Sequence, residues 1–169
     1  MKILLTGGSG CGKSSFAESL VMKLPLPRWY VATMQPYGSE SEAKIARHRA
    51  MRAAKGFETI ESQTDVGKID LPHGGTVLLE CLCNLTANEM FDEKGACSDP
   101  TERVLAGVEA LAAQCDDLVV VTNDVGSDGG GYDPLTQRYV EVVGRINAAL
   151  SQRADQVFEL VCGIPIRLK

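Results

Sequence analysis

Short apolar runs alternate along the chain with longer segments whose apolar residues recur at helical spacing. The apolar runs are nearly continuous, which is typical of strands that are buried on both faces of a parallel sheet. The pattern predicts strands over residues 2–6, 29–32, 76–80 and 118–123, and a terminal strand pair over residues 156–161 and 164–168.

The segments between these runs favour helices. Their periodicity predicts helices over residues 13–24, 39–55, 99–114 and 133–153. The last two open on Asp-Pro pairs, in which the aspartate caps the helix and the proline occupies its first turn. Strands that alternate with helices in this way predict an α/β sandwich around a largely parallel sheet.

Length and composition are those of an ordinary globular protein. One hydrophobic core can organise 169 residues, so residues 1–169 are expected to form a single domain. The longest apolar runs are far too short for a membrane span, and no leader pattern opens the sequence, so a soluble protein is expected. The six cysteines form no C-x-x-C pair and suit no familiar zinc site. We therefore expect reduced cysteines and a cytoplasmic location.

The charge balance bears on the class of partner. Lysine and arginine number 17 against 22 acidic residues, which gives a net charge of -5. Such a chain has no sequence-independent attraction to nucleic acid or to an anionic membrane. Any phosphate-binding site must therefore be local.

One motif supplies such a site. Residues 7–14, Gly-Gly-Ser-Gly-Cys-Gly-Lys-Ser, match G-x-x-x-x-G-K-[ST] in full and lie between a predicted strand and a predicted helix. The glycines allow backbone N–H groups to approach phosphate oxygens, and the N-terminus of the helix adds partial positive charge. Lys13 can neutralise the β- and γ-phosphates, and the Ser14 hydroxyl can bind Mg²⁺. The expected fold is therefore a P-loop NTPase-like (RecA-like) α/β sandwich, with helices flanking a largely parallel central sheet.

A magnesium nucleotide also needs an acidic ligand from a neighbouring strand. Glu80 ends the predicted strand 76–80, and Asp124 follows the strand 118–123. Ligands of open parallel sheets lie beyond the carboxyl ends of the strands, where both residues fall. Both remain candidates. The alternative for Glu80 is a solvated residue that leaves the strand, and the alternative for Asp124 is a side chain that caps its own turn.

A cationic cluster occupies the predicted helix 39–55. Lys44, His48 and Arg52 are four residues apart and share one helix face, and Arg47 and Arg49 flank His48. Cations around an imidazole favour its neutral form, which can attack phosphorus. The residues alone favour the simpler interpretation of a solvated charged face. His73, in Leu-Pro-His-Gly-Gly, is expected in a surface turn.

In this order, the motifs resemble the bifunctional adenosylcobinamide kinase / adenosylcobinamide-phosphate guanylyltransferase family of cobalamin biosynthesis. The resemblance spans nearly the whole chain. It rests on the following segments: the glycine loop, Tyr30-Val-Ala-Thr33, Glu40-x-x-x-Lys44-Ile45-x-x-His48-Arg49, Glu58-Thr-Ile-Glu61, Leu78-Leu-Glu-Cys-Leu82, Asn88, Phe91, Val121-Thr-Asn-Asp-Val-Gly126, Gly144-Arg-Ile-Asn147 and residues 163–169.

The resemblance implies two reactions. A nucleoside triphosphate phosphorylates the hydroxyl of adenosylcobinamide. GTP then transfers GMP to adenosylcobinamide phosphate and releases pyrophosphate, through a GMP–histidine intermediate whose position here is His48. GTP and ATP are the implied nucleotide substrates, with Mg²⁺ held by Ser14 and Glu80, and a homotrimer is the implied assembly. The implied catalytic residues are His48 and Lys13, and the implied nucleotide contacts are Gly7, Gly8, Ser9, Gly10, Cys11, Gly12, Lys13, Ser14, Lys44, Arg49, Arg52, Glu61 and Glu80.

Two other functions are compatible with the glycine loop. One is a different small-molecule P-loop kinase, in which the helix of His48 is only a basic lid. The other is a GTP-binding switch that operates on a protein partner. Neither of them would form a GMP adduct.

Overall fold

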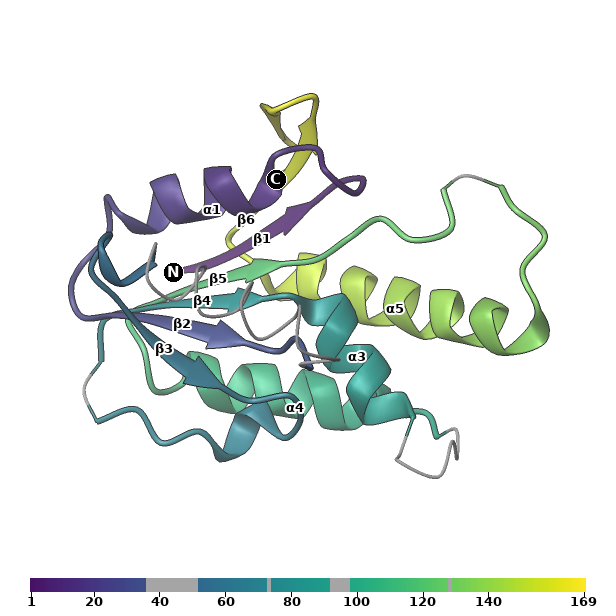
Figure 1. Ribbon diagram of the computed structural model, residues 1–169, viewed down its shortest axis with the longest axis horizontal. Helices are drawn as coiled ribbons and strands as arrows, with labels where there is room; N and C mark the ends of the chain where they lie inside the picture. Colours follow the sequence, from purple (N-terminus) through teal and green to yellow (C-terminus); the bar gives the residue numbers. More distant parts are fainter. Residues whose placement is uncertain (36–51, 73, 92–97, 128) are drawn as a thin grey trace.

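A seven-stranded sheet forms the centre of the molecule (Figure 1). The structure is a computed structural model, and it describes residues 1–35, 52–72, 74–91, 98–127 and 129–169. Across the sheet the strands follow the order β3 (Phe57–Glu61), β2 (Arg28–Ala32), β4 (Thr76–Glu80), β5 (Asp117–Val121), β1 (Lys2–Thr6), β6 (Gln156–Val161) and β7 (Ile164–Arg167). Only the last pair, β6 and β7, is antiparallel. The largely parallel sheet and the terminal strand pair are therefore confirmed.

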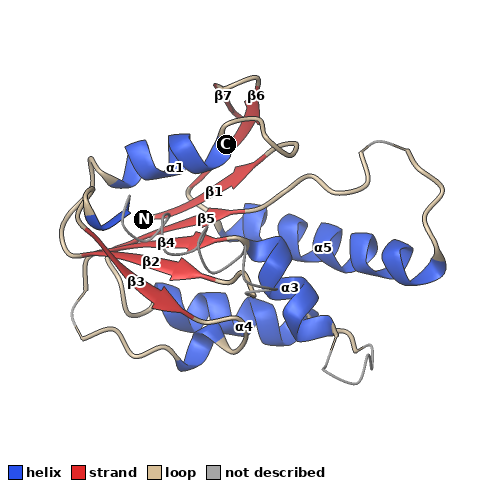
Figure 2. Cartoon of the chain, in the orientation of Figure 1, coloured by secondary structure: helices blue, strands red, loops and turns tan. Residues whose placement is uncertain are grey.

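Helices cover both faces of the sheet (Figure 2). Helix α1 (Lys13–Val21) lies on one face, and α3 (Leu82–Met90), α4 (Thr101–Ala112) and α5 (Pro134–Arg153) lie on the other. A short 3₁₀ helix, η1 (Val66–Lys68), packs against α4. Each face has its own apolar core, because successive strand residues point to opposite sides. For example, Leu5 and Leu78 pack on the α1 side, whereas Leu4 and Leu79 pack on the other.

Most of the expected elements have the expected bounds. Helix α1 ends at Val21, three residues before the predicted end. The Asp133 side chain caps α5 by accepting hydrogen bonds from the backbone N–H groups of Leu135 (3.0 Å) and Thr136 (3.2 Å). The predicted helix 39–55 falls mainly on residues 36–51, which lie outside the described residues.

Besides the short helix η1, two elements were not predicted. Strand β3 is a short edge strand whose two glutamates interrupt its apolar pattern. Helix α3 follows β4 directly and buries Thr86 and Glu89 alongside its leucines, so the apolar residues alone do not mark its inner face. Neither element changes the fold class. Within the described ranges, no helix is both long and apolar enough to cross a bilayer.

The order of the strands determines which residues can meet. Strand β5 separates β1 from β4, and β2 lies beyond β4. Because these four strands are parallel, their carboxyl ends share one edge of the sheet. The glycine loop, the residues after β5, Glu80 and the end of β2 therefore lie along this edge.

Candidate functional site

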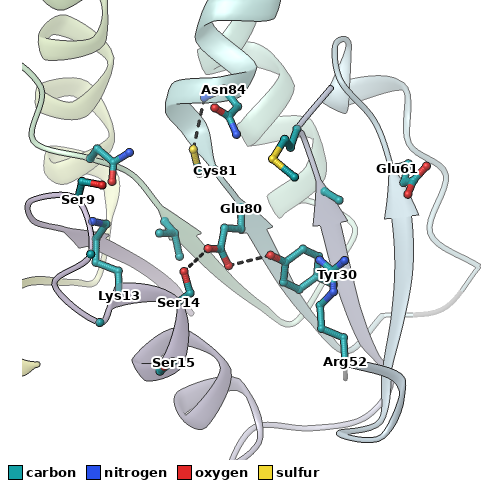
Figure 3. Close-up of a pocket in the computed structure, with 16 residues that line it drawn as sticks. Ser9, Lys13, Ser14, Ser15, Tyr30, Arg52, Glu61, Glu80, Cys81 and Asn84 are labelled. Atoms are coloured by element: carbon teal, nitrogen blue, oxygen red, sulfur yellow. Dashed lines mark hydrogen bonds between the residues drawn. The ribbon is translucent and has the colours of Figure 1, made fainter. Parts of the chain in front are cut away.

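A cavity of about 490 Å³ opens at the carboxyl edge of the sheet. One part of its wall is the glycine loop with the first turn of α1, and the opposite part includes Tyr30, Arg52 and Glu61 (Figure 3). Glu80 lies between the two parts. The cavity thus joins the sequence-predicted loop to residues that lie far from it in the sequence.

The glycine loop is held in a conformation that favours glycine. Gly7 has φ +139°, and a Cβ atom there would lie 2.6 Å from the carbonyl oxygen of Leu160. Gly12, the N-cap of α1, is left-handed with φ 96°. The Gly163 N–H, in the turn between β6 and β7, donates to the Cys11 carbonyl (2.9 Å) and so connects the loop to the C-terminal hairpin. The N-terminus of α1 opens into the cavity, and the N-terminus of a helix is a favourable environment for an anion.

The ammonium group of Lys13 lies inside this loop. The side chain is only 6% exposed, and Nζ donates to the carbonyl oxygens of Gly7 (2.9 Å) and Gly8 (2.6 Å). These carbonyls satisfy the charged group, since a buried charge needs hydrogen-bond partners. The positive charge is therefore already located where the loop would receive phosphate oxygens.

Glu80 accepts two hydrogen bonds from opposite directions. Its Oε1 accepts from the Ser14 hydroxyl, and its Oε2 accepts from the Tyr30 hydroxyl at 2.9 Å (Figure 3). Ser14 and Glu80 thus present two hard oxygen donors side by side, the donor type that Mg²⁺ takes in proteins. The residues present fit a magnesium ion.

The other acidic candidate, Asp124, does not join this group. Its side chain is exposed and is not part of the cavity wall, while its backbone N–H donates to the Gly7 carbonyl at 3.2 Å. The sequence offered two carboxylates as candidate magnesium ligands. The structure places Glu80, and not Asp124, beside Ser14.

Two polar side chains, Thr33 and Asn88, join the strand ends behind Glu80. The Thr33 hydroxyl accepts from the Cys81 backbone N–H and donates to the Cys81 carbonyl, both at 2.8 Å. The Asn88 amide, from α3, donates to the carbonyls of Thr33 (2.8 Å) and Gln63 (2.9 Å). The ends of β2 and β4 and the residues after β3 are held together in this way. Asn88 is one of the residues on which the family resemblance rests, and these bonds give it a structural role.

Two further motifs meet beside the glycine loop. Asn147, on α5, accepts from the Thr122 hydroxyl (2.8 Å) and donates to the Asn123 carbonyl (3.3 Å). The Cys83 sulfur accepts from the Asn123 backbone N–H at 3.4 Å, and hydrogen bonding from Cys81 lowers the pKa of the Cys83 thiol. The backbone of Asn123 is therefore held from two sides, and its side chain forms part of the cavity wall.

Arg52 is the one member of the cationic cluster that lies among the described residues. It is 7% exposed, and its guanidinium carbon lies 3.7 Å from the centroid of the Tyr30 ring. Arg52 therefore reaches the cavity, and the interpretation as a solvated face is wrong for this residue. Glu61, the last residue of β3, also borders the cavity.

The remaining cationic residues lie outside the described residues. They are Lys44, Arg47, His48 and Arg49, and His73 also falls there.

Sequence reasoning missed Tyr30, Asn84 and Asn123 as parts of the cavity wall. Asn123 and Asn84 follow the carboxyl ends of β5 and β4, which is the signal that had identified Glu80. Tyr30 has no such signal, because an aromatic residue in the middle of a buried strand reads as core.

Comparisons with known proteins agree on one family. A family model described as cobinamide kinase / cobinamide phosphate guanyltransferase matches residues 3–168. The bifunctional adenosylcobalamin biosynthesis protein CobU of Escherichia coli (strain K12) is 32% identical over 184 residues, which cover 100% of both chains. The corresponding protein CobP of Pseudomonas aeruginosa is 31% identical over 176 residues, which cover 100% of this chain and 98% of the relative.

Solved structures resemble the fold. The flagellar accessory protein FlaH from Methanocaldococcus jannaschii has a TM-score of 0.55 at 10% identity, over 99% of this chain and 77% of that chain. A DnaB-like replicative helicase has a TM-score of 0.50 at 11% identity, over 93% of this chain and 47% of the helicase. At such low identity the likeness shows the fold alone, and it confirms the expected P-loop NTPase-like architecture.

Proposed function

The chain belongs to the cobinamide kinase / cobinamide phosphate guanyltransferase family, and from this premise we propose that it carries out both reactions. In the first, a nucleoside triphosphate phosphorylates the hydroxyl of adenosylcobinamide. In the second, GTP donates GMP to the resulting phosphate. The observation that carries the proposal is the meeting of Lys13, Ser14 and Glu80 in one cavity at the carboxyl edge of the sheet.

The glycine loop would hold the triphosphate in both reactions. Its backbone N–H groups and the N-terminus of α1 would bind phosphate oxygens, and Lys13 would neutralise charge that develops on the departing group. Ser14 and Glu80 would hold Mg²⁺, which would supply further neutralisation of the phosphate oxygens. The nucleotide substrates would be GTP and ATP, and the contacts would come from Gly7, Gly8, Ser9, Gly10, Cys11, Gly12, Lys13, Ser14, Lys44, Arg49, Arg52, Glu61 and Glu80.

His48 would be the nucleophile of the guanylyl transfer. A neutral imidazole nitrogen would attack the α-phosphorus of GTP, the bond to the β-phosphate oxygen would break, and pyrophosphate would leave. A phosphate oxygen of adenosylcobinamide phosphate would then attack the same phosphorus and displace the imidazole. Lys44, Arg49 and Arg52 would steady the α-phosphate, and the burial of Arg52 in the cavity wall supports this role.

We also propose that residues 1–169 act as one catalytic domain within a homotrimer. Strand β7 is exposed along its whole length, and Ile164 (65% exposed) and Ile166 (45%) present apolar surface there. Such a surface suits contact with another copy of the chain. Light scattering coupled to size exclusion chromatography tests the trimer, and a monomer at working concentration would contradict it.

The test of the function is a covalent adduct. The protein is incubated with Mg²⁺ and GTP labelled at the α-phosphate, denatured, and examined for protein-bound label that is acid-labile and alkali-stable, as a phosphoramidate would be. We expect label on the peptide that contains His48. A small-molecule kinase of another kind or a GTP-binding switch would leave the denatured protein unlabelled.

A further inference from the structure

Tyr30 is buried beside the carboxylate that the proposed function assigns to magnesium. Its side chain is 8% exposed, its ring packs edge-on against Phe57 at a centroid distance of 6.1 Å, and Arg52 lies over the ring. Its hydroxyl donates to Oε2 of Glu80 at 2.9 Å. Phenylalanine would serve the packing equally well, so the hydroxyl calls for a separate explanation.

The Tyr30 hydroxyl is the donor in its bond with Glu80, because a carboxylate oxygen accepts. A buried phenol of this kind is stable where it has a hydrogen-bond partner, and Glu80 is that partner. The hydrogen bond therefore constrains the carboxylate as much as it satisfies the phenol.

This constraint has a direction. With Oε2 engaged by Tyr30, Oε1 is directed to the Ser14 hydroxyl on the opposite side (Figure 3). A carboxylate attached to a flexible glutamate side chain would otherwise sample several rotamers. We propose that Tyr30 is a positioning residue that fixes Glu80 so that Oε1, together with Ser14, is preorganised for the magnesium ion of the bound nucleotide.

The contact with Arg52 extends the same role. Arg52 follows His48 by four residues, and its guanidinium lies over the Tyr30 ring while the hydroxyl of that ring holds Glu80. Tyr30 thus contacts both Glu80, the proposed magnesium ligand, and Arg52, which is proposed to steady the α-phosphate. This inference rests on the proposed function, because that function assigns Glu80 to the magnesium ion.

The test compares nucleotide binding with and without magnesium. The probe is fluorescent GTP with a methylene bridge between the α- and β-phosphates, titrated in Mg²⁺ and in EDTA without adenosylcobinamide. The bridge prevents attack by His48 from releasing pyrophosphate, and without the corrinoid there is no acceptor for the γ-phosphoryl group. In Y30F we expect the ratio of the affinity in Mg²⁺ to the affinity in EDTA to fall about tenfold, which is the usual contribution of a hydrogen bond to a charged group. Affinity in EDTA should stay within about twofold of the wild type, because the glycine loop is intact.

Two further variants complete the design. Y139F is the matched control: Tyr139 is also a partly buried tyrosine, but its hydroxyl donates to the Cys83 carbonyl at 3.1 Å, so its removal should leave the magnesium effect unchanged. In E80Q, adding Y30F should cause no further loss, since Tyr30 acts through Glu80. A tyrosine with a structural role alone would lower the melting temperature and leave the ratio of the two affinities unaltered.

The outcomes separate the inference from the function. An undiminished magnesium effect in Y30F overturns the inference, and so does a Y30F chain that fails to fold, because Tyr30 would then be structural. If His48 carries label in the wild type while Y30F binds normally, only the inference fails. If the wild type shows neither label nor any magnesium effect, the proposed function fails with it.

Discussion

The two ends of the cavity are built in different ways. At the glycine-loop end, residues 7–14 offer mainly backbone: N–H groups, a helix N-terminus and a lysine held by the loop's own carbonyls. At the tyrosine end, defined by Tyr30, Arg52 and Glu61, three separate segments of the chain supply side chains (Figure 3). Glu80 contacts both ends through Ser14 and Tyr30.

Because they are built differently, the two ends of the cavity suit different tasks. Backbone groups in a fixed loop bind any triphosphate, which suits a site used in two reactions. Side chains from distant segments are aimed individually, which suits the parts that distinguish one reaction from the other. The comparison therefore predicts that damage to the glycine-loop end impairs both reactions, whereas loss of the proposed nucleophile His48 separates them.

The largest expected effect is the separation of the two reactions in H48A. Loss of the nucleophile should abolish guanylyl transfer and leave phosphorylation of adenosylcobinamide intact, because phosphorylation needs no histidine adduct. Separate assays of the phosphorylated and guanylylated corrinoids measure this. H73A, which changes the other of the chain's two histidines, serves as the control. An H48A protein that still converts adenosylcobinamide phosphate and GTP to the guanylylated product would break the comparison.

Replacing Lys13 should impair both reactions together. Loss of its charge beside the phosphates should lower each rate at least about 100-fold, in line with the removal of a single electrostatic contact to a transition state. The measurement is kcat/KM for each reaction in K13A. K23A removes a lysine that is exposed just beyond α1 and should match the wild type. A K13A protein that lost only one activity would show that the reactions do not share the loop.

The same contrast explains what the sequence could and could not predict. The glycine loop is a contiguous motif whose function resides in eight successive residues, so it was identified with its strand and helix. Glu80 followed from a rule about strand ends, but Asp124 satisfied that rule equally well. Only the strand order, with β5 between β1 and β4, and the exposure of Asp124 distinguish them.

At the tyrosine end, Arg52 and Glu61 were predicted as nucleotide contacts only through the family resemblance, and Tyr30 was missed for a physical reason. Tyr30 meets Glu80 because β2 pairs with β4, and it meets Arg52 because residue 52 precedes β3, which pairs with β2. Local sequence carries no information on those pairings. Helix α3 was missed because Glu89 is buried there, and its charge is compensated by Arg103, at 2.6 Å, from α4. A polar residue with a distant partner looks exposed in the sequence and is buried in the fold.

A smaller effect is expected from backbone conformation at the glycine-loop end. G7A places a methyl group 2.6 Å from the Leu160 carbonyl at φ +139°, which should cost about 1–3 kcal/mol of unfolding free energy. G8A is the matched control for stability, because a Cβ atom at Gly8 meets nothing within 4 Å. Chemical denaturation of both variants measures the difference. Equal stability of G7A and G8A would mean that the close approach of β6 to the loop does not constrain it.

The smallest effect should come from a residue outside both ends. Asp133 caps α5, and hydrogen bonds from Thr136 hold the pKa of its carboxyl below the ordinary value. A carboxyl with a lowered pKa in the folded state stabilises the protein above its ordinary pKa, and the contribution is lost as pH falls through the folded value. D133A should therefore lower the melting temperature by a few degrees at pH 7 and by less near pH 3, while both reaction rates stay unchanged.

D133N keeps a capping oxygen without a charge, so it should retain most of the stability at pH 7 and show a weaker dependence on pH. A drop in either reaction rate at full folding would mean that the start of α5 contributes to the cavity, and the division into two ends would then have to include it.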